Sequence, residues 1–196
     1  MANDFRSARF WASAIIEKAL FDGTTAVDAT LGNGHDCLWL CGLVGETGRV
    51  YGFDIQQEAV ERSRARLAEN GMESRATLIH DGHQNMLSHV ERESADAVMF
   101  NLGWLPGAQH GVTTYVETTL QAVNAALEAL KQDGVMTVCV YPGHEEGARE
   151  REALIEWAKG LDEKRFDAMI QSYLNQSNDP PLMIAVKKNK RKAKER

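Results

Sequence analysis

Residues that could bind a small molecule gather in five short polar clusters, each directly after an apolar run. Glycine at 32 and 34 lets the backbone turn tightly and approach a ligand, because glycine has no Cβ atom. Carboxylates and amides in the other clusters can hydrogen-bond hydroxyl and amino groups. The clusters are Asp28, Gly32, Asn33, Gly34, His35 and Asp36; Asp54; Asp81, Gly82 and His83; Asn101, Leu102 and Gly103; and Tyr141, Pro142, Gly143 and His144.

The first cluster is acidic, which bears on the kind of nucleotide that it could hold. Asp28 and Asp36 bracket the glycines, whereas a pyrophosphate at a helix N-terminus is favoured by N–H donors and disfavoured by carboxylates. The third small residue of the dinucleotide fingerprint is replaced by Cys37. S-adenosylmethionine (SAM) carries a sulfonium and an ammonium and no phosphate, so Coulomb attraction to Asp28 favours SAM over NAD.

Two further carboxylates are placed to bind a nucleoside. Asp54 ends the second apolar run, 20 residues after Gly34. An acidic residue at this spacing accepts hydrogen bonds from ribose hydroxyls, a role shared by NAD and SAM enzymes. Asp81 follows the third run, where a carboxylate can accept from an adenine amino group. One such aspartate alone is more often a cap or turn residue, so the prediction rests on all five clusters together.

The apolar periodicity alternates between helix and strand, which predicts an α/β fold. We expect a Rossmann-like three-layer sandwich whose mostly parallel sheet ends in a C-terminal antiparallel hairpin, in one domain of residues 1–187 with a basic, disordered tail at 188–196. A helix over 114–134 is predicted from a capping box of Thr114 and Glu117 and a stop at Gly134. Other helices are expected at 4–21, 35–45, 56–71 and 147–160, and strands at 24–30, 48–55, 76–82, 95–103, 134–143, 164–176 and 180–188.

Cysteine and histidine spacing argues against a metal. Cys37, Cys41 and Cys139 are an odd number, so we expect free thiols in a reducing compartment, packed in the core. Cys37 and Cys41 have no third cysteine nearby to complete an iron–sulfur site. We expect no metal.

Charge and hydropathy favour a cytoplasmic protein with a local nucleic-acid contact, if any. The net charge is −6, yet residues 187–196 hold seven Lys/Arg and one Glu. This tail is either a solvated segment or an arm that grips phosphates. No apolar run approaches the roughly 20 residues of a membrane span, and the N-terminus lacks a secretory signal.

Four segments resemble those of a known family: "DATLGNGHD", "VYGFDIQ", "NLGWLPG" and "YPGHEEG". They are similar to the signature blocks of small SAM-dependent methyltransferases once labelled rRNA methylases, whose characterised members are tRNA 5-(aminomethyl)uridine methyltransferases. The resemblance covers about residues 5–187 and implies the class I SAM-dependent methyltransferase fold. Trp104 stands where the family pattern has tyrosine, and Leu31 where it often has cysteine.

The resemblance implies methyl transfer to the exocyclic amine of 5-aminomethyluridine at the wobble position of a tRNA anticodon stem-loop. Asn101 would orient the amine and help to bind the cofactor, Tyr141 or His144 would line the exit of its proton, and Trp104 could stack on the uridine. A homodimer is expected in part from the resemblance. The cofactor set it implies is Asp28, Gly32, Asn33, Gly34, His35, Asp36, Asp54, Gln56, Asp81, His83 and Asn101, and the substrate set is Gly103, Trp104, Pro106, Gly107, Tyr141 and His144.

Three alternatives stay open at the level of sequence. A methyltransferase acting on rRNA or on a small amine would use the same cofactor residues. An NAD-dependent oxidoreductase would bind NAD and ignore SAM. A non-catalytic RNA-binding module would bind RNA without any need for Asp28 or Asp54.

Overall fold

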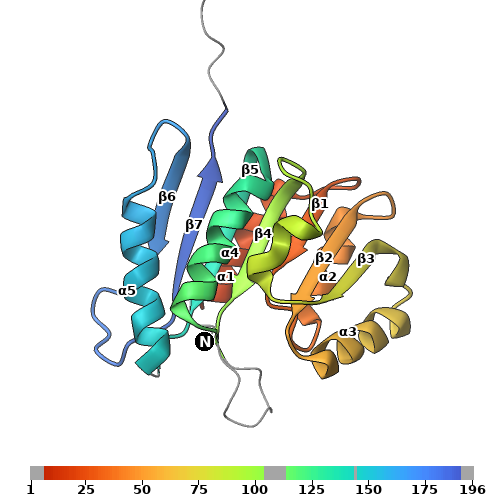
Figure 1. The fold of residues 1–196 in the computed structure, drawn as a ribbon, viewed down its shortest axis with the longest axis horizontal. Coiled ribbons are helices and arrows are strands. Elements are labelled where there is room, and N and C mark those ends of the chain that lie inside the picture. The colour runs from red at the N-terminus through yellow and green to blue at the C-terminus, as the bar shows by residue number, and fades with distance from the viewer. Residues whose placement is uncertain (1–6, 104–113, 144, 191–196) are drawn as a thin grey trace, which may run out of the picture.

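The computed structural model describes residues 7–103, 114–143 and 145–190, which form one α/β sheet structure (Figure 1). Its helices and strands follow each other in the alternation that the sequence predicts. In chain order they are α1 (Ala8–Ala19), β1 (Thr25–Asp28), α2 (His35–Val44), β2 (Arg49–Asp54), α3 (Gln57–Glu69), η1 (Glu73–Arg75), β3 (Ala76–His80), η2 (His83–Ser88), β4 (Ala95–Asn101), α4 (Val116–Ala129), β5 (Leu130–Val140), α5 (Glu145–Lys159), β6 (Phe166–Gln171) and β7 (Leu182–Lys188).

The seven strands form one mixed sheet in the order β3-β2-β1-β4-β5-β7-β6. The first five positions are parallel, while β7 runs antiparallel to both β5 and β6. The predicted C-terminal hairpin is therefore confirmed. The strand order reverses between β1 and β4, and in open α/β sheets ligands bind at such a reversal, beyond the carboxyl ends of the strands.

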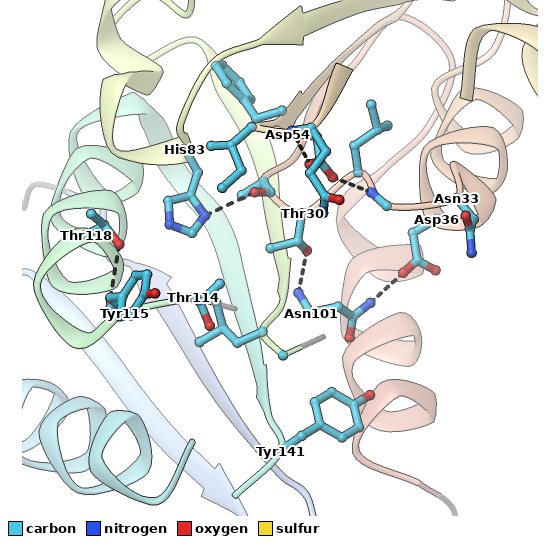
Figure 2. Close-up of a pocket in the computed structure, with 18 of the residues that line it drawn as sticks. Thr30, Asn33, Asp36, Asp54, His83, Asn101, Thr114, Tyr115, Thr118 and Tyr141 are labelled. Atoms are coloured by element: carbon cyan, nitrogen blue, oxygen red, sulfur yellow. Dashed lines mark hydrogen bonds between the residues drawn. The ribbon is translucent and has the colours of Figure 1, made fainter. Parts of the chain in front are cut away.

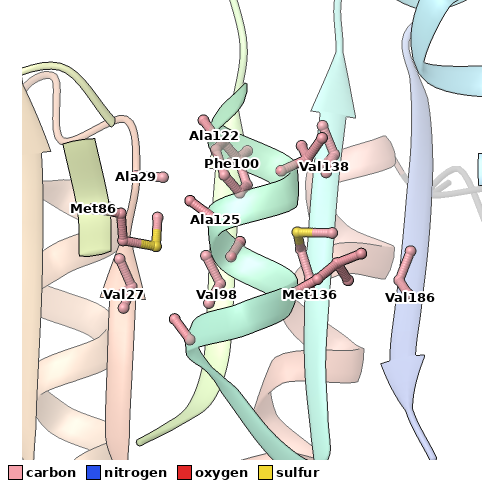
Figure 3. Close-up of a cluster of buried hydrophobic side chains, with 14 of the residues drawn as sticks. Val27, Ala29, Met86, Val98, Phe100, Ala122, Ala125, Met136, Val138 and Val186 are labelled. Atoms are coloured by element: carbon pink, nitrogen blue, oxygen red, sulfur yellow. The ribbon is translucent and has the colours of Figure 1, made fainter. Parts of the chain in front are cut away.

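Helices cover both faces of the sheet (Figure 1). Alternate strand residues point to opposite faces, so each strand packs against helices on both sides. Val27 and Val98 pack with α4 and α5 on one face, whereas Ala26 and Ala97 pack with α2 and α3 on the other. Figure 3 shows Met136 and Val138 of β5 on the α4 face, opposite Ala122 and Ala125. This double coverage makes the central strands apolar on both sides.

The predicted helix over 114–134 is wrong at both ends. α4 begins after Tyr115, which makes no side-chain cap bond. Thr114, the predicted cap, donates its hydroxyl hydrogen to Glu150 of α5 instead. The helix ends at Ala129, and the buried Leu130 already pairs with Ala95 of β4. Five residues that fit a helix by composition therefore belong to an irregular start of β5, where tertiary pairing outweighs local propensity.

The other predicted helices and strands are present, with ends that differ by a few residues. α1 and α5 lie within or beside their expected ranges, and Gly71 follows α3 with a positive φ of 66° as its helix-ending position requires. The three cysteines are free and buried, as expected. Lys188, at which the predicted strand and the predicted tail overlap, is the buried last residue of β7 and not part of a tail.

Candidate functional site

A cavity of about 970 Å³ opens at the carboxyl ends of β1 to β5. This volume lies at the upper end of the roughly 300–1,000 Å³ typical of small-molecule sites. Its apolar wall includes Leu31, Phe53, Ile55 and Leu102. The predicted site residues that line it are Gly32, Asn33, His35, Asp36, Asp54, Gln56, Asp81, His83, Asn101, Gly103 and Tyr141.

Six predicted residues are not in that set. Trp104, Pro106, Gly107 and His144 lie outside the described residues. Asp28 and Gly34 are described but do not line the cavity. Their positions indicate that they support the loop between β1 and α2.

Asp54 joins the end of β2 to the loop after β1. Its Oδ2 accepts from the backbone N–H of Gly32 at 2.9 Å, and its Oδ1 accepts from that of Gln56 at 2.9 Å (Figure 2). A carboxylate offers about four acceptor positions, so Asp54 can still accept from ligand hydroxyls. The pairing brings the first two predicted clusters to one side of the cavity.

Gly34 is required by close packing of the loop on α3. Its φ is 74°, in the left-handed region, and a Cβ atom there would lie 2.6 Å from Oγ and 2.8 Å from Cα of Ser63. Arg66 of α3 donates to the Asn33 carbonyl at 2.7 Å. The conformation of this loop therefore depends on its contacts with α3 as well as on its own glycines.

Asp28 is buried beneath this loop, with 1% of its surface exposed. Its Oδ1 accepts from the Thr30 N–H at 3.1 Å, while Oδ2 has no hydrogen-bond partner among the described residues. Burial, followed by the nearby Asp36, raises the pKa of Asp28 to about 8. At neutral pH this shift favours the protonated carboxyl, which reduces the attraction to a cation that was expected from a carboxylate.

His83 presents an acceptor nitrogen to the other side of the cavity. Its Nδ1 lies 3.2 Å from the Ala29 carbonyl, and burial lowers the pKa of His83, which favours a neutral ring. A carbonyl only accepts, so Nδ1 carries the hydrogen and Nε2 is left as an acceptor. Figure 2 shows the ring facing Thr118 and Tyr115 of the α4 end.

Asp81 is tied into its own turn. It accepts from the Gly82 N–H and the Asn85 amide, each at 2.7 Å, and from His89 at 3.1 Å. The Asn85 and His89 hydrogen bonds lower the pKa of Asp81. The carboxylate lines the cavity in its ionised form, as a nucleobase amino group would require.

Asn101, at the end of β4, is held from two sides. Its backbone N–H donates to Oγ1 of Thr30 at 2.7 Å, and its side-chain Nδ2 donates to Oδ2 of Asp36 (Figure 2). The Oδ1 atom of Asn101 is buried and has no partner within the described part of the chain. Asn101 lines the cavity, and its Oδ1 is an acceptor that no described group uses.

Two residues near Asn101 complete this corner. Tyr141 lines the cavity at the end of β5, and burial raises its pKa to about 12, so it remains a phenol at neutral pH. Arg9 of α1 also lines the cavity and pairs with Asp36. Sequence reasoning missed Arg9, because it lies outside every motif in a helix that shows only an amphipathic pattern.

The α4 end of the cavity was also missed. Thr114, Tyr115 and Thr118 line it, yet the sequence indicated only a helix start there. No sequence motif marks this wall, because the exposure of Tyr115, which is 56%, is known only from the folded chain.

The residues present fit a SAM-sized cofactor better than a metal. The cavity combines an apolar wall with carboxylates, an imidazole acceptor and an unused amide oxygen, all suited to hydroxyl and amine donors. Within residues 7–103, 114–143 and 145–190, no three His, Cys, Asp or Glu side chains are grouped as metal ligands would be. No helix in the same ranges is long and apolar enough to cross a membrane.

Comparison with known proteins shows the family of this chain. The family described as "Putative rRNA methylase" matches residues 50–187. A curated relative, "tRNA (mnm(5)s(2)U34)-methyltransferase, chloroplastic" from Arabidopsis thaliana, is 32% identical over 186 residues, which are 90% of this chain and 68% of that protein.

Two crystal structures carry the same fold at substantial identity. One, a "putative rRNA-methylase" from Clostridium thermocellum, is 40% identical with a TM-score of 0.91, over 95% of this chain and 100% of that one. The other, a "putative methyltransferase" from Streptococcus mutans in complex with SAH, is 33% identical with a TM-score of 0.85, over 94% and 99%. The protein has the class I methyltransferase fold, and its cofactor is SAM. The chain thus belongs to the "Putative rRNA methylase" family of SAM-dependent methyltransferases.

Proposed function

We propose that the protein methylates the exocyclic amine of 5-aminomethyluridine at the tRNA wobble position, giving 5-methylaminomethyluridine. The observation that carries this proposal is the unpartnered, buried Oδ1 of Asn101 at the cavity. An acceptor held in that place suits a nucleophile that itself carries N–H groups. The printed name of the Arabidopsis thaliana relative supports a modified wobble uridine as the target.

The chain's own residues would position the amine and let its proton leave. A primary amine is mostly protonated at neutral pH, so a proton must depart before nitrogen attacks. Asn101 Oδ1 would accept one amine hydrogen and orient the lone pair, while Tyr141, and His144 as predicted from the sequence, would line the proton's path to solvent. Bound SAM supplies the methyl group as an electrophile, and the C–S electron pair stays with the departing S-adenosylhomocysteine.

The α4 end of the cavity would hold the uridine. Tyr115 is exposed at the mouth and offers an aromatic face on which an unstacked base could lie. Thr114 and Thr118 add hydroxyl groups to the same wall. The substrate roles predicted for Gly103, Trp104, Pro106 and Gly107 stay predictions, and the last three of these residues lie outside the described residues.

The proposed partner of the protein is an RNA. An RNA substrate is supported by the family description and by the relative's name. The tRNA anticodon stem-loop, the homodimer and the cytoplasmic location remain predictions.

Two measurements test the proposal. Calorimetric titration with S-adenosylhomocysteine and with NAD should show binding of the first alone. Purified protein, SAM and tRNA bearing the aminomethyl group should then yield 5-methylaminomethyluridine on nucleoside analysis, while tRNA lacking that group should take up no methyl. If the protein methylates rRNA or a free small amine and does not react with the aminomethyl tRNA, the proposed substrate is wrong and that alternative substrate takes its place.

A further inference from the structure

Arg9 lies in α1, far along the chain from the motifs, yet it reaches the corner of the cavity that holds Asn101. Its Nε donates to Oδ1 of Asp36 at 3.0 Å, and its Nη2 contacts the same oxygen. The side chain of Asp36 is only 13% exposed, so this ion pair is partly shielded from water. Partly buried charge-assisted bonds of this kind are stronger and more directional than exposed ones.

The Arg9–Asp36 pair determines how the Asn101 amide must point. The partner of a guanidinium in an ion pair is a carboxylate, and a carboxylate can only accept hydrogen bonds. The second Asp36 oxygen, Oδ2, faces the Asn101 amide. The NH₂ end must therefore turn to Asp36, because the flipped amide would bring two acceptor oxygens together.

We propose that Arg9 is a positioning residue that acts through Asp36 to hold the Asn101 carbonyl toward the substrate nitrogen. The nature of that nitrogen rests on the proposed function, but the orientation of the amide does not. The three side chains come from α1, the start of α2 and the end of β4. A relay across three elements explains why the N-terminal helix contributes to a site otherwise built from strand ends.

The test compares Arg9→Gln with Arg62→Gln as a matched control. Arg62 also pairs with a carboxylate, Glu58, and its side chain is 46% exposed against 50% for Arg9, but it lies on α3 outside the cavity. Arg9→Gln should lower kcat by about 10- to 100-fold, the loss typical of a small misplacement at a reacting centre. The KM for RNA and the Kd for S-adenosylhomocysteine should stay within about twofold.

Two further variants show whether Arg9 acts through Asp36. Arg9→Lys keeps the charge but not the paired N–H geometry, so its kcat should lie between those of the wild type and Arg9→Gln. In a double-mutant cycle, Arg9→Gln combined with Asp36→Asn should be no slower than Asp36→Asn alone.

An NMR measurement tests the amide without any turnover. In a spectrum of ¹⁵N-labelled full-length protein with S-adenosylhomocysteine, Asn101→Asp identifies the side-chain NH₂ signals of Asn101 by their loss. These signals should move in Arg9→Gln and stay in place in Arg62→Gln. Any one of three results for Arg9→Gln would overturn the proposal. The NH₂ signals could stay in place, kcat could be unchanged, or only the KM for RNA could rise, as expected if Arg9 contacts RNA directly. A wild type that ignores aminomethyl tRNA would refute the substrate only, since the NMR result does not depend on it.

Discussion

Asp28 lies in surroundings that disfavour the ionised form of a carboxyl group. It is buried, one of its oxygens has no hydrogen-bond partner among the described residues, and its pKa is raised from 3.8 to about 8. In the unfolded chain the same carboxyl loses its proton near its ordinary value. Between about pH 4 and pH 8 the folded protein therefore binds a proton that the unfolded chain has released.

This raised pKa predicts that Asp28 makes stability fall as pH rises. The effect should be absent below about pH 4 and complete above about pH 8, with a slope of at most about 1.4 kcal/mol per pH unit between them. Asp28→Asn keeps an acceptor for the Thr30 N–H and removes the titration, so its free energy of unfolding should decline less over this range. Urea denaturation at several pH values measures the difference.

Asp167→Asn is the matched control, because Asp167 is exposed on β6. It should leave the pH dependence of the unfolding free energy as in the wild type. If Asp28→Asn behaves in the same way, Asp28 is ionised in the folded protein and the argument from burial fails.

At the scale of elements, the loop between β1 and α2 depends on how closely it packs against α3. A methyl group at residue 34 would meet both the backbone and side chain of Ser63, whereas one at residue 71 would meet nothing within 4 Å. Both glycines have positive φ, 74° and 66°. Comparing alanine substitutions at residues 34 and 71 therefore separates the cost of a positive φ from the cost of the steric clash with Ser63.

We predict that Gly34→Ala is the more damaging of the two alanine substitutions. Gly71→Ala should cost about 1 kcal/mol of unfolding free energy, as expected for a left-handed alanine. Gly34→Ala should cost about 1–3 kcal/mol more, by analogy with overpacked sites, and should weaken binding of S-adenosylhomocysteine. Equal losses from both variants would show that the loop shifts freely and that its contact with α3 is unimportant.

A buried lysine, Lys188, hydrogen-bonds the end of β7 to the end of α4. Nζ of Lys188 donates to the carbonyls of Leu127 and Leu130, at 3.0 and 2.6 Å, where α4 ends and β5 begins. These carbonyls cannot be bonded within a helix that stops at Ala129. Lys188 thus stabilises the same junction that sequence periodicity misassigned to a longer helix.

Lys188→Met should destabilise the protein by about 1–3 kcal/mol, because it leaves buried acceptors without a donor. The neighbouring Lys187 provides the control, since it is exposed and pairs with Asp133 at 3.3 Å. Lys187→Met should cost less than about 1 kcal/mol, as is usual for surface ion pairs. A Lys188→Met protein with the wild-type melting temperature would contradict this role.

For the whole molecule, the proposed RNA substrate must bind to a chain whose net charge is negative. The net charge is −6, while residues 191–196 carry four Lys/Arg and one Glu. If these residues contact phosphates, deleting them should weaken tRNA binding and reduce the slope of log Kd against log salt concentration by about 2–3. Fluorescence anisotropy at several salt concentrations measures both quantities. An unchanged slope would indicate that the tail does not contact the RNA.

The sequence by itself determined the order of helices and strands, the sheet class and the polar strand-end residues that line the cavity. Hydrophobic periodicity reports local burial, and the carboxyl ends of parallel strands meet at one edge, so Asp54, Asp81 and Asn101 could be grouped from their positions alone. The nature of the cofactor also followed from the residues and from the family that they resemble.

Tertiary structure alone decided the features that depend on contacts between distant residues. Arg9 and Asp36 are 27 residues apart, and Asp36 and Asn101 are 65 apart, so no local pattern reveals their pairing. The proton on Asp28 and the early end of α4 likewise follow from burial and from strand pairing around them. Protonation and amide orientation depend on neighbours in space, and those neighbours exist only once the chain has folded.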